Sequence, residues 1–173
     1  MKTLICYRSK YGSTRQYAEW LHKEVKSDLV DIEKEHPDFK SYDVIVFGGY
    51  LRMGKIVIAQ NIKNNWDKIE NKEILFFTTS GLPVGHPLVK KAYENSLQEN
   101  MRRKIKYFPL RGRQINRNLS LLDKLLMFVG SSMEKDEETK KGMRTDFDEV
   151  KPDSLRPLLN YLRAKENERA PGK

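Results

Sequence analysis

Short apolar runs rich in β-branched residues recur along the first two thirds of the chain, and each is bounded by turn residues. The clearest runs occupy residues 3–7, 44–49 and 74–79, a weaker one occupies 105–110, and a short one occupies 29–32. Runs of this length and composition are typical of buried β-strands. The sequence therefore predicts five strands.

Helical patterns lie between these strands. Apolar residues recur on one face between residues 17 and 25, after the first strand, and again between 88 and 97. A final helix is expected over residues 153–165, with Asp153 as its N-cap. Strands and helices that alternate from the start of the chain are typical of a parallel sheet with helices on both faces. The pattern therefore predicts an α/β fold with right-handed crossovers.

The size of the chain and its single cysteine narrow the class of protein. At 173 residues and 38% hydrophobic content, the chain is long enough for one domain and short for two. We expect one domain over residues 1–173, with a polar tail at 166–173. Because Cys6 is the only cysteine, neither a disulfide nor a cysteine metal cluster can form within one chain. This composition favours a reducing cytoplasm.

The charge of the chain points to anionic partners. The formal net charge is +9, which favours phosphates, carboxylates, nucleic acid or an acidic membrane surface. Its first residues lack the apolar length of a signal peptide, and no apolar stretch is long enough to span a bilayer. We therefore expect a soluble protein, attached to a membrane surface at most.

The segment after the first strand has the composition of an anion site. Ser9, Ser13 and Thr14 offer hydroxyl groups, Gly12 permits a turn with positive φ, and a helix N-terminus follows. In a parallel sheet, ligands bind beyond the carboxyl ends of the strands, where this segment lies. It therefore suits a phosphate-sized anion. The alternative is an ordinary turn in which Thr14 caps the helix.

Known nucleotide motifs do not fit this segment. It lacks the Gly-Lys-Ser/Thr ending of a Walker loop and the three spaced glycines of a dinucleotide fingerprint. ATP, GTP and NAD are therefore disfavoured.

Three segments together resemble the flavodoxin-like family. Residues 9–14 look like the loop that surrounds the phosphate of flavin mononucleotide (FMN), residues 48–54 fall where the second loop lies against the flavin ring, and residues 78–83 match the third loop. The cofactor-binding residues that the resemblance implies are Ser9, Lys10, Tyr11, Gly12, Ser13, Thr14, Gly49, Tyr50, Leu51, Arg52, Met53, Gly54, Thr79, Ser80 and Gly81. It implies no metal and no catalytic side chain, because flavin supplies the redox chemistry.

The resemblance also implies a fold and an activity. The fold would be a three-layer sandwich around a five-stranded parallel sheet of order 2-1-3-4-5. Within the family, the chain looks closest to the group that includes the bacterial flavin-dependent protoporphyrinogen dehydrogenases. It would then be an FMN-dependent oxidoreductase acting on protoporphyrinogen or a similar anionic organic substrate. Two alternatives stay open, an FMN electron carrier that docks on a protein partner and a basic binding module with a degenerate flavin site.

The second and third loops carry specific expectations from the resemblance. The backbone amide of Gly49 would approach the flavin edge, and Tyr50 would stack on the ring or border it. The third loop of flavodoxins commonly supplies an aromatic side chain, whereas residues 78–83 contain none. The flavin ring would therefore be more exposed than in an ordinary flavodoxin. His86 lies just past this loop, where it either enters the next helix or donates a proton.

A basic stretch and an apolar stretch follow each other in the last third of the chain. Residues 102–117 hold seven Lys and Arg and no acid, which suits an anionic substrate, an acidic redox partner or anionic lipid. Residues 119–133 read as an inserted helix that is apolar nearly all round. It packs on the core, on a second subunit as a homodimer, or at the inner face of the membrane. Nucleic acid is not expected, because Tyr107 and Phe108 read as core.

Overall fold

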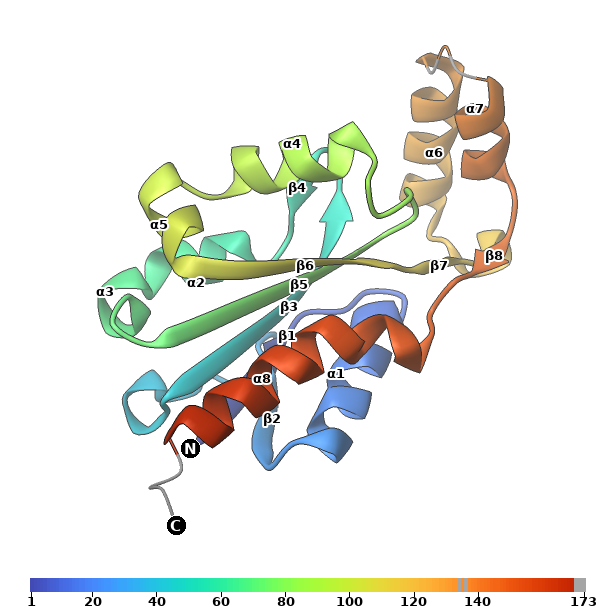
Figure 1. Cartoon of the computed structure of the whole chain (residues 1–173). Coiled ribbons are helices and arrows are strands. Elements are labelled where there is room, and N and C mark those ends of the chain that lie inside the picture. The colour runs from blue at the N-terminus through green and yellow to red at the C-terminus, as the bar shows by residue number, and fades with distance from the viewer. Residues whose placement is uncertain (134, 136, 170–173) are drawn as a thin grey trace.

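A parallel β-sheet runs through the middle of the computed structural model, which describes residues 1–133, 135 and 137–169 (Figure 1). Its strands pair in the order β2-β1-β3-β5-β6, and all of these pairs are parallel. The strands are β1 (Thr3–Tyr7), β2 (Ser27–Asp31), β3 (Val44–Arg52), β5 (Glu73–Ser80) and β6 (Ile105–Arg111). The predicted order 2-1-3-4-5 is therefore confirmed, and the short β4 (Lys55–Ile56) pairs antiparallel with β3.

Helices cover both faces of the sheet, as the alternating pattern predicts (Figure 1). On one face lie α1 (Ser13–Glu24) and α8 (Arg156–Arg169), and on the other lie α2 (Ala59–Asn64), α3 (Trp66–Ile69), α4 (Pro87–Ser96) and α5 (Glu99–Lys104). Short 3₁₀ turns, η1 (Phe39–Ser41) and η3 (Pro152–Leu155), precede β3 and α8. The final helix thus extends past the expected end at Lys165, while residues 170–173 of the expected tail lie outside the described residues.

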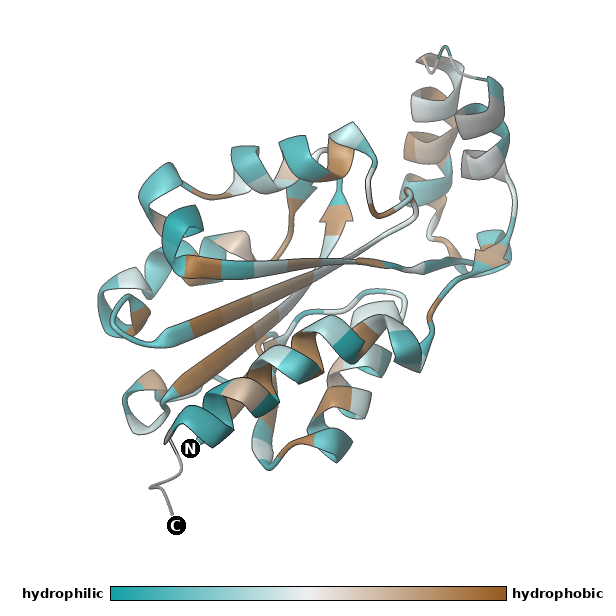
Figure 2. Cartoon of the chain, in the orientation of Figure 1, coloured by the Kyte–Doolittle hydropathy of each residue, from teal (hydrophilic) through white to brown (hydrophobic). Residues whose placement is uncertain are grey.

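The hydrophobic core consists of two layers separated by the sheet, whose central strands β3 and β5 are brown along much of their length in Figure 2. Because successive side chains of a strand point to opposite faces, Leu4 and Cys6 join one layer while Ile5 and Tyr7 join the other. Burial raises the pKa of the Cys6 thiol to about 12. Cys6 is therefore a small buried apolar residue and is not reactive at neutral pH.

An insertion projects from the carboxyl end of the sheet (Figure 1). It lies between β7 (Arg113–Gln114) and β8 (Phe147–Asp148), an antiparallel pair, and contains η2 (Asn116–Asn118), α6 (Leu121–Met133) and α7 (Glu137–Arg144). We call residues 116–146 the insertion. In the part of it that the structure describes, no residue joins either core layer.

The expectation that the apolar helix at residues 119–133 packs on the core is therefore wrong. The side chains of Leu121, Leu122 and Leu125 are 85%, 58% and 58% exposed. The helix leaves the sheet edge at its first turn and packs beside α7 instead (Figure 1). A second subunit and a membrane surface remain as the two other predicted coverings. Among the described residues, no helix is both long and apolar enough to cross a membrane.

Candidate functional site

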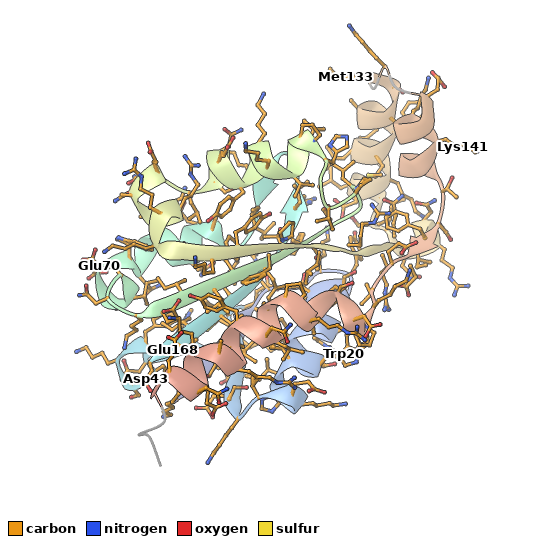
Figure 3. The ribbon with its side chains drawn as sticks, in the orientation of Figure 1. Trp20, Asp43, Glu70, Met133, Lys141 and Glu168 are labelled. Carbon is orange, nitrogen blue, oxygen red and sulfur yellow. The ribbon has the colours of Figure 1, made fainter. Side chains whose placement is uncertain are left out.

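The three predicted loops meet at one edge of the sheet. Because β1, β3, β5 and β6 run parallel, their carboxyl ends lie together, and the insertion rises beside them. Met133 and Lys141 mark the outer end of the insertion, whereas Asp43 and Glu70 mark the opposite edge of the sheet (Figure 3). The topology therefore concentrates the candidate residues at one end of the molecule.

The first loop opens onto the N-terminus of α1. Gly12 has a φ of +90°, so the positive φ expected from the sequence is confirmed. A side chain there would have open space, so the backbone conformation is what requires glycine. Gly12 occupies the N-cap position of α1, and no side chain caps it, which makes the Thr14 cap a wrong alternative. The uncapped first turn keeps backbone N–H groups without helical partners.

The hydroxyl groups of the first loop point in different directions. The Ser9 Oγ accepts a hydrogen bond from the Gly12 N–H at 3.2 Å. The Ser13 Oγ accepts one from the Arg113 N–H at 3.1 Å, so its own proton stays available to a ligand. Ser9 and Ser13 therefore flank the uncapped turn with oxygen atoms that can also donate.

Thr14 instead connects the first turn of α1 to β3 and β5 inside the protein. Its side chain is 1% exposed, and its Oγ1 lies 2.9 Å from the Oγ1 of Thr79 and 3.3 Å from the carbonyl oxygen of Gly49. The structure thus brings residues of all three predicted segments together. These hydroxyl groups are already paired within the protein, so they position the loops.

The second segment differs from the expected loop. β3 continues through Tyr50 and Leu51 to Arg52, and a two-residue turn at Met53 (φ +50°) and Gly54 (φ +71°) leads into β4. Two positive φ values in succession are typical of a type I′ hairpin. The expectation that residues 48–54 follow the strand as a loop is therefore wrong for residues 48–52, which belong to β3, and holds only for the turn at 53–54.

Packing within the protein accounts for the glycine at position 49. A Cβ atom on Gly49 would lie 2.7 Å from the Cγ2 of Ile58, closer than real Cβ contacts allow. Glycine is therefore required here by Ile58, and the close approach of a ligand is not needed to explain it. Tyr50 is half-buried at the end of β3, and Met53 is 71% exposed at the tip of the hairpin.

The third segment begins as the last residues of β5, 78–80, and continues as a turn held by its own residues. The Ser80 hydroxyl donates to the Leu82 carbonyl at 3.0 Å and accepts from the Leu82 N–H at 3.2 Å. The His86 Nδ1 accepts from the Leu88 N–H at 3.2 Å, so the helix-entry alternative for His86 is confirmed.

An aromatic residue that the sequence pattern did not indicate lies against the third segment. A Cβ on Gly81 would lie 3.2 Å from the ring of Phe147, which belongs to β8. The Arg111 guanidinium donates to the Gly81 carbonyl and lies 5.1 Å from the centre of that ring. The only signal in the sequence is a lone aromatic in the polar segment 144–149.

Asp123 of α6 reaches back to the first and second segments. Its carboxylate accepts hydrogen bonds from the Lys10 ammonium and the Tyr11 hydroxyl at Oδ2, and from the Arg52 guanidinium at Oδ1, 2.5 Å away. The residue is 7% exposed. Sequence reasoning missed it, because no pattern in residues 119–133 relates one acid to the first loop. Lys10, Tyr11 and Arg52 were predicted site residues, and the structure brings them together.

These contacts determine the charge of Asp123. Burial alone raises the pKa of its carboxyl group, but hydrogen bonds from Lys10, Tyr11 and Arg52 outweigh burial and hold that pKa well below its usual range. The hydrogen bond to Asp123 likewise raises the pKa of Lys10. The carboxylate and the ammonium are therefore both charged at neutral pH.

The basic stretch 102–117 does not form one patch. Residues 102–104 end α5 at the amino end of β6, whereas residues 111–117 follow its carboxyl end. A seven-residue strand separates the two groups by about 20 Å. Three of the cations also pair with carboxylates: Arg103 with Glu99, Lys104 with Glu70 and Arg113 with Asp148. Only the second group of cations lies at the site edge.

Comparison with known proteins agrees with this fold. Residues 4–141 match the family described as Flavodoxin domain. The chain is 29% identical over 86 residues to the flavodoxin-like domain-containing protein BilS of Clostridioides difficile (strain CD3), covering 47% of this chain and 48% of BilS. It is 35% identical over 60 residues to the protoporphyrinogen IX dehydrogenase (quinone) of Escherichia coli (strain K12), and the match covers 31% of this chain and 33% of that protein. These matches span a third to a half of the relatives' lengths.

Solved structures of flavoproteins are more distant. The flavoprotein of Lactobacillus acidophilus NCFM, crystallised in complex with FMN, is 22% identical, covers 64% of this chain and 91% of its own, and has a TM-score of 0.44. The WrbA-like flavodoxin of Agrobacterium tumefaciens is 18% identical and has a TM-score of 0.48; the match covers 71% of this chain and 87% of the flavodoxin. Neither places a ligand in this chain.

Proposed function

Because this chain belongs to the flavodoxin domain family, whose members bind FMN, we propose that it binds FMN and transfers electrons as a small oxidoreductase. The observation that carries the proposal is the uncapped N-terminus of α1, where Gly12 has its positive φ. Its backbone N–H groups and the hydroxyls of Ser9 and Ser13 would hold the phosphate. The flavin supplies the redox chemistry, so the protein must bind and orient it.

The residues around this turn fit the cofactor. Thr14 and Thr79 tie the start of α1 to β3 and β5 in a fixed edge, beside which the ring would lie. A rigid edge favours one orientation of a bound ring. Phe147, beside Gly81, would supply the aromatic surface that the third segment itself lacks.

An anionic organic substrate such as protoporphyrinogen is the finer part of the proposal. It is supported by Lys10, Arg52 and Arg111, which put cationic groups at the same edge. The similarity to a protoporphyrinogen IX dehydrogenase covers only part of either chain, so the substrate rests on this chemistry. An FMN electron carrier is the second candidate, and it would require a protein partner before its flavin is reduced.

A fluorescence titration tests flavin binding. We expect desalted protein to quench FMN fluorescence saturably near one equivalent, and Gly12→Asp to weaken binding about tenfold or more by strain and charge repulsion at the phosphate. Gly142→Asp makes the same substitution in open space on α7 and should bind FMN like the wild type. Riboflavin, which has no phosphate, should bind weakly and equally to all three. Absence of quenching with FMN in large excess would contradict the proposal.

A second measurement separates enzyme from carrier. The FMN-loaded protein is mixed anaerobically with protoporphyrinogen, and loss of the absorbance of oxidised flavin is followed. Reduction by the small molecule alone supports the enzyme. Reduction that needs an added reductase or protein donor supports the carrier.

A further inference from the structure

The contacts of Asp123 describe a complete binding site for a carboxylate. One oxygen receives the Lys10 ammonium and the Tyr11 hydroxyl, and the other receives the Arg52 guanidinium. Charge-assisted hydrogen bonds of this kind are about twice as strong as neutral ones. The two oxygens are served by separate donors, which suits the planar, two-oxygen geometry of a carboxylate.

The donors and the acceptor belong to different parts of the molecule. Lys10 and Tyr11 lie in the loop between β1 and α1, and Arg52 ends β3, so all three belong to the sheet and its connections. Asp123 belongs to the insertion, none of whose described residues joins the core. The backbone that carries the donors is therefore separate from the segment that carries Asp123.

Polar contacts hold α6 beside the loop. Besides the three bonds to Asp123, the Ser120 N–H donates to the Tyr11 hydroxyl at 3.1 Å. Three leucines of α6 are exposed, Leu121, Leu122 and Leu125, and Leu121 is the most exposed. An incoming carboxylate could accept the same charge-assisted hydrogen bonds, so exchanging it for Asp123 need not lose any of them.

We propose that Lys10, Tyr11 and Arg52 form a carboxylate-binding site that Asp123 fills from within the chain, and that the carboxylate of an anionic substrate occupies it by displacing Asp123. The carboxylate site is inferred from these contacts alone. Only the identification of its ligand as a substrate rests on the proposed function. Substrate binding would then release α6 from the first loop. A neutral analogue would lack the group that displaces Asp123.

Succinate serves as the probe, with sodium chloride keeping the ionic strength constant. Asp123→Asn removes the internal carboxylate and most of its attraction, so calorimetry should show succinate binding at least about tenfold tighter than in the wild type, because the site is no longer occupied. Glu166→Gln also removes one negative charge, from the exposed side of α8, and should bind succinate like the wild type. Equal affinities for Asp123→Asn and the wild type would overturn the proposal.

Arg52→Gln identifies the site. Introduced into Asp123→Asn, it should abolish the tenfold gain, because one of the two carboxylate oxygens loses its donor. A gain that survives Arg52→Gln would mean that succinate binds elsewhere, which also overturns the proposal.

Hydrogen exchange of the wild type tests displacement without any variant. Succinate should speed exchange of the amides in residues 121–133 several-fold, and sodium chloride at the same ionic strength should not. No change with saturating succinate overturns the proposal.

FMN and riboflavin form two further arms of the exchange experiment. If FMN speeds exchange of α6 but riboflavin and succinate do not, the flavin phosphate is the anion that displaces Asp123, and the carboxylate proposal fails. If FMN does not bind at all and Asp123→Asn still gains affinity for succinate, the flavin proposal fails and the carboxylate site stands.

Discussion

The sheet and the insertion are both rich in apolar residues, yet they meet different surroundings. In β5 the side chains of Phe76 and Phe77 are 0% exposed, because helices cover both faces of the sheet. In α6 the side chains of Leu122 and Leu125 are each 58% exposed. Hydrophobic burial therefore stabilises the sheet, at roughly 25 cal/mol per Å² of apolar surface, and contributes little to the insertion.

The difference shows how the two regions are held in place. The sheet is stabilised by apolar packing on both faces, and this packing does not depend on any single polar contact. The insertion is attached through its β7–β8 base and through the carboxylate of Asp123. A region attached in this way can move without unfolding the rest, since local opening costs least where buried apolar contacts are few.

The largest expected effect is in the core. Phe77→Ala should lower the free energy of unfolding by about 3–5 kcal/mol, because it removes a fully buried ring and leaves a cavity beside Tyr17. Urea unfolding followed by circular dichroism measures it. A loss under about 1 kcal/mol would mean that the sheet is not packed as described.

Overpacking the same region should cost less. A Cβ atom on Gly48 would lie 2.3 Å from the ring of Phe77, so Gly48→Ala should destabilise the protein by about 1–3 kcal/mol. Gly142→Ala has open space and is the matched control, expected to be neutral or slightly stabilising. In unfolding titrations, Phe77→Leu should recover part of the loss in Gly48→Ala. Additive losses would show that the two sites do not touch.

The insertion should respond to pH instead. The folded-state pKa of Asp123 is lowered, so its contacts act fully above the unfolded value of about 3.9 and are lost as the pH falls through the lower folded value. The raised pKa of Lys10 preserves them up to the ordinary lysine value of about 10.4.

Hydrogen exchange corrected for intrinsic rates measures this dependence. Protection of residues 121–133 should stay constant between about pH 5 and 9 and fall only in stronger acid. In Asp123→Asn the protection should be lower and should lack this acid step. Loss of protection in the wild type already near pH 6 would contradict the assignment.

The smallest effect is expected on the exposed side of α6. Leu122→Gln and Leu125→Gln should each change the free energy of unfolding by less than about 0.5 kcal/mol, as is usual for exposed positions. Measurements at low and high protein concentration check this. A loss above about 1.5 kcal/mol that grows with concentration would show that a second copy covers this side.

Several features of the site were predictable because they depend on local chemistry. Residues 3–7 form an apolar run with β-branched residues and make up β1 with the bounds expected. Gly12 has the positive φ expected of the turn between β1 and α1. The periodicity of apolar positions does not specify the order of the strands, which the family resemblance implied. Tyr50, Leu51 and Arg52 were misread as a loop, because the glycine pair 48–49 reads as the end of a strand, whereas β3 continues to Arg52 and pairs with β4.

The sequence by itself determined the alternation of strands and helices, since the period of apolar positions reflects which faces are buried. It also determined the turn at Gly12, because only glycine adopts that φ freely. The tertiary structure alone decided that Lys10 meets Asp123, 113 residues away, and that Phe147 covers Gly81. Such pairings depend on where the insertion leaves the sheet. A contact between side chains so far apart in the sequence produces no local sequence pattern from which it could be predicted.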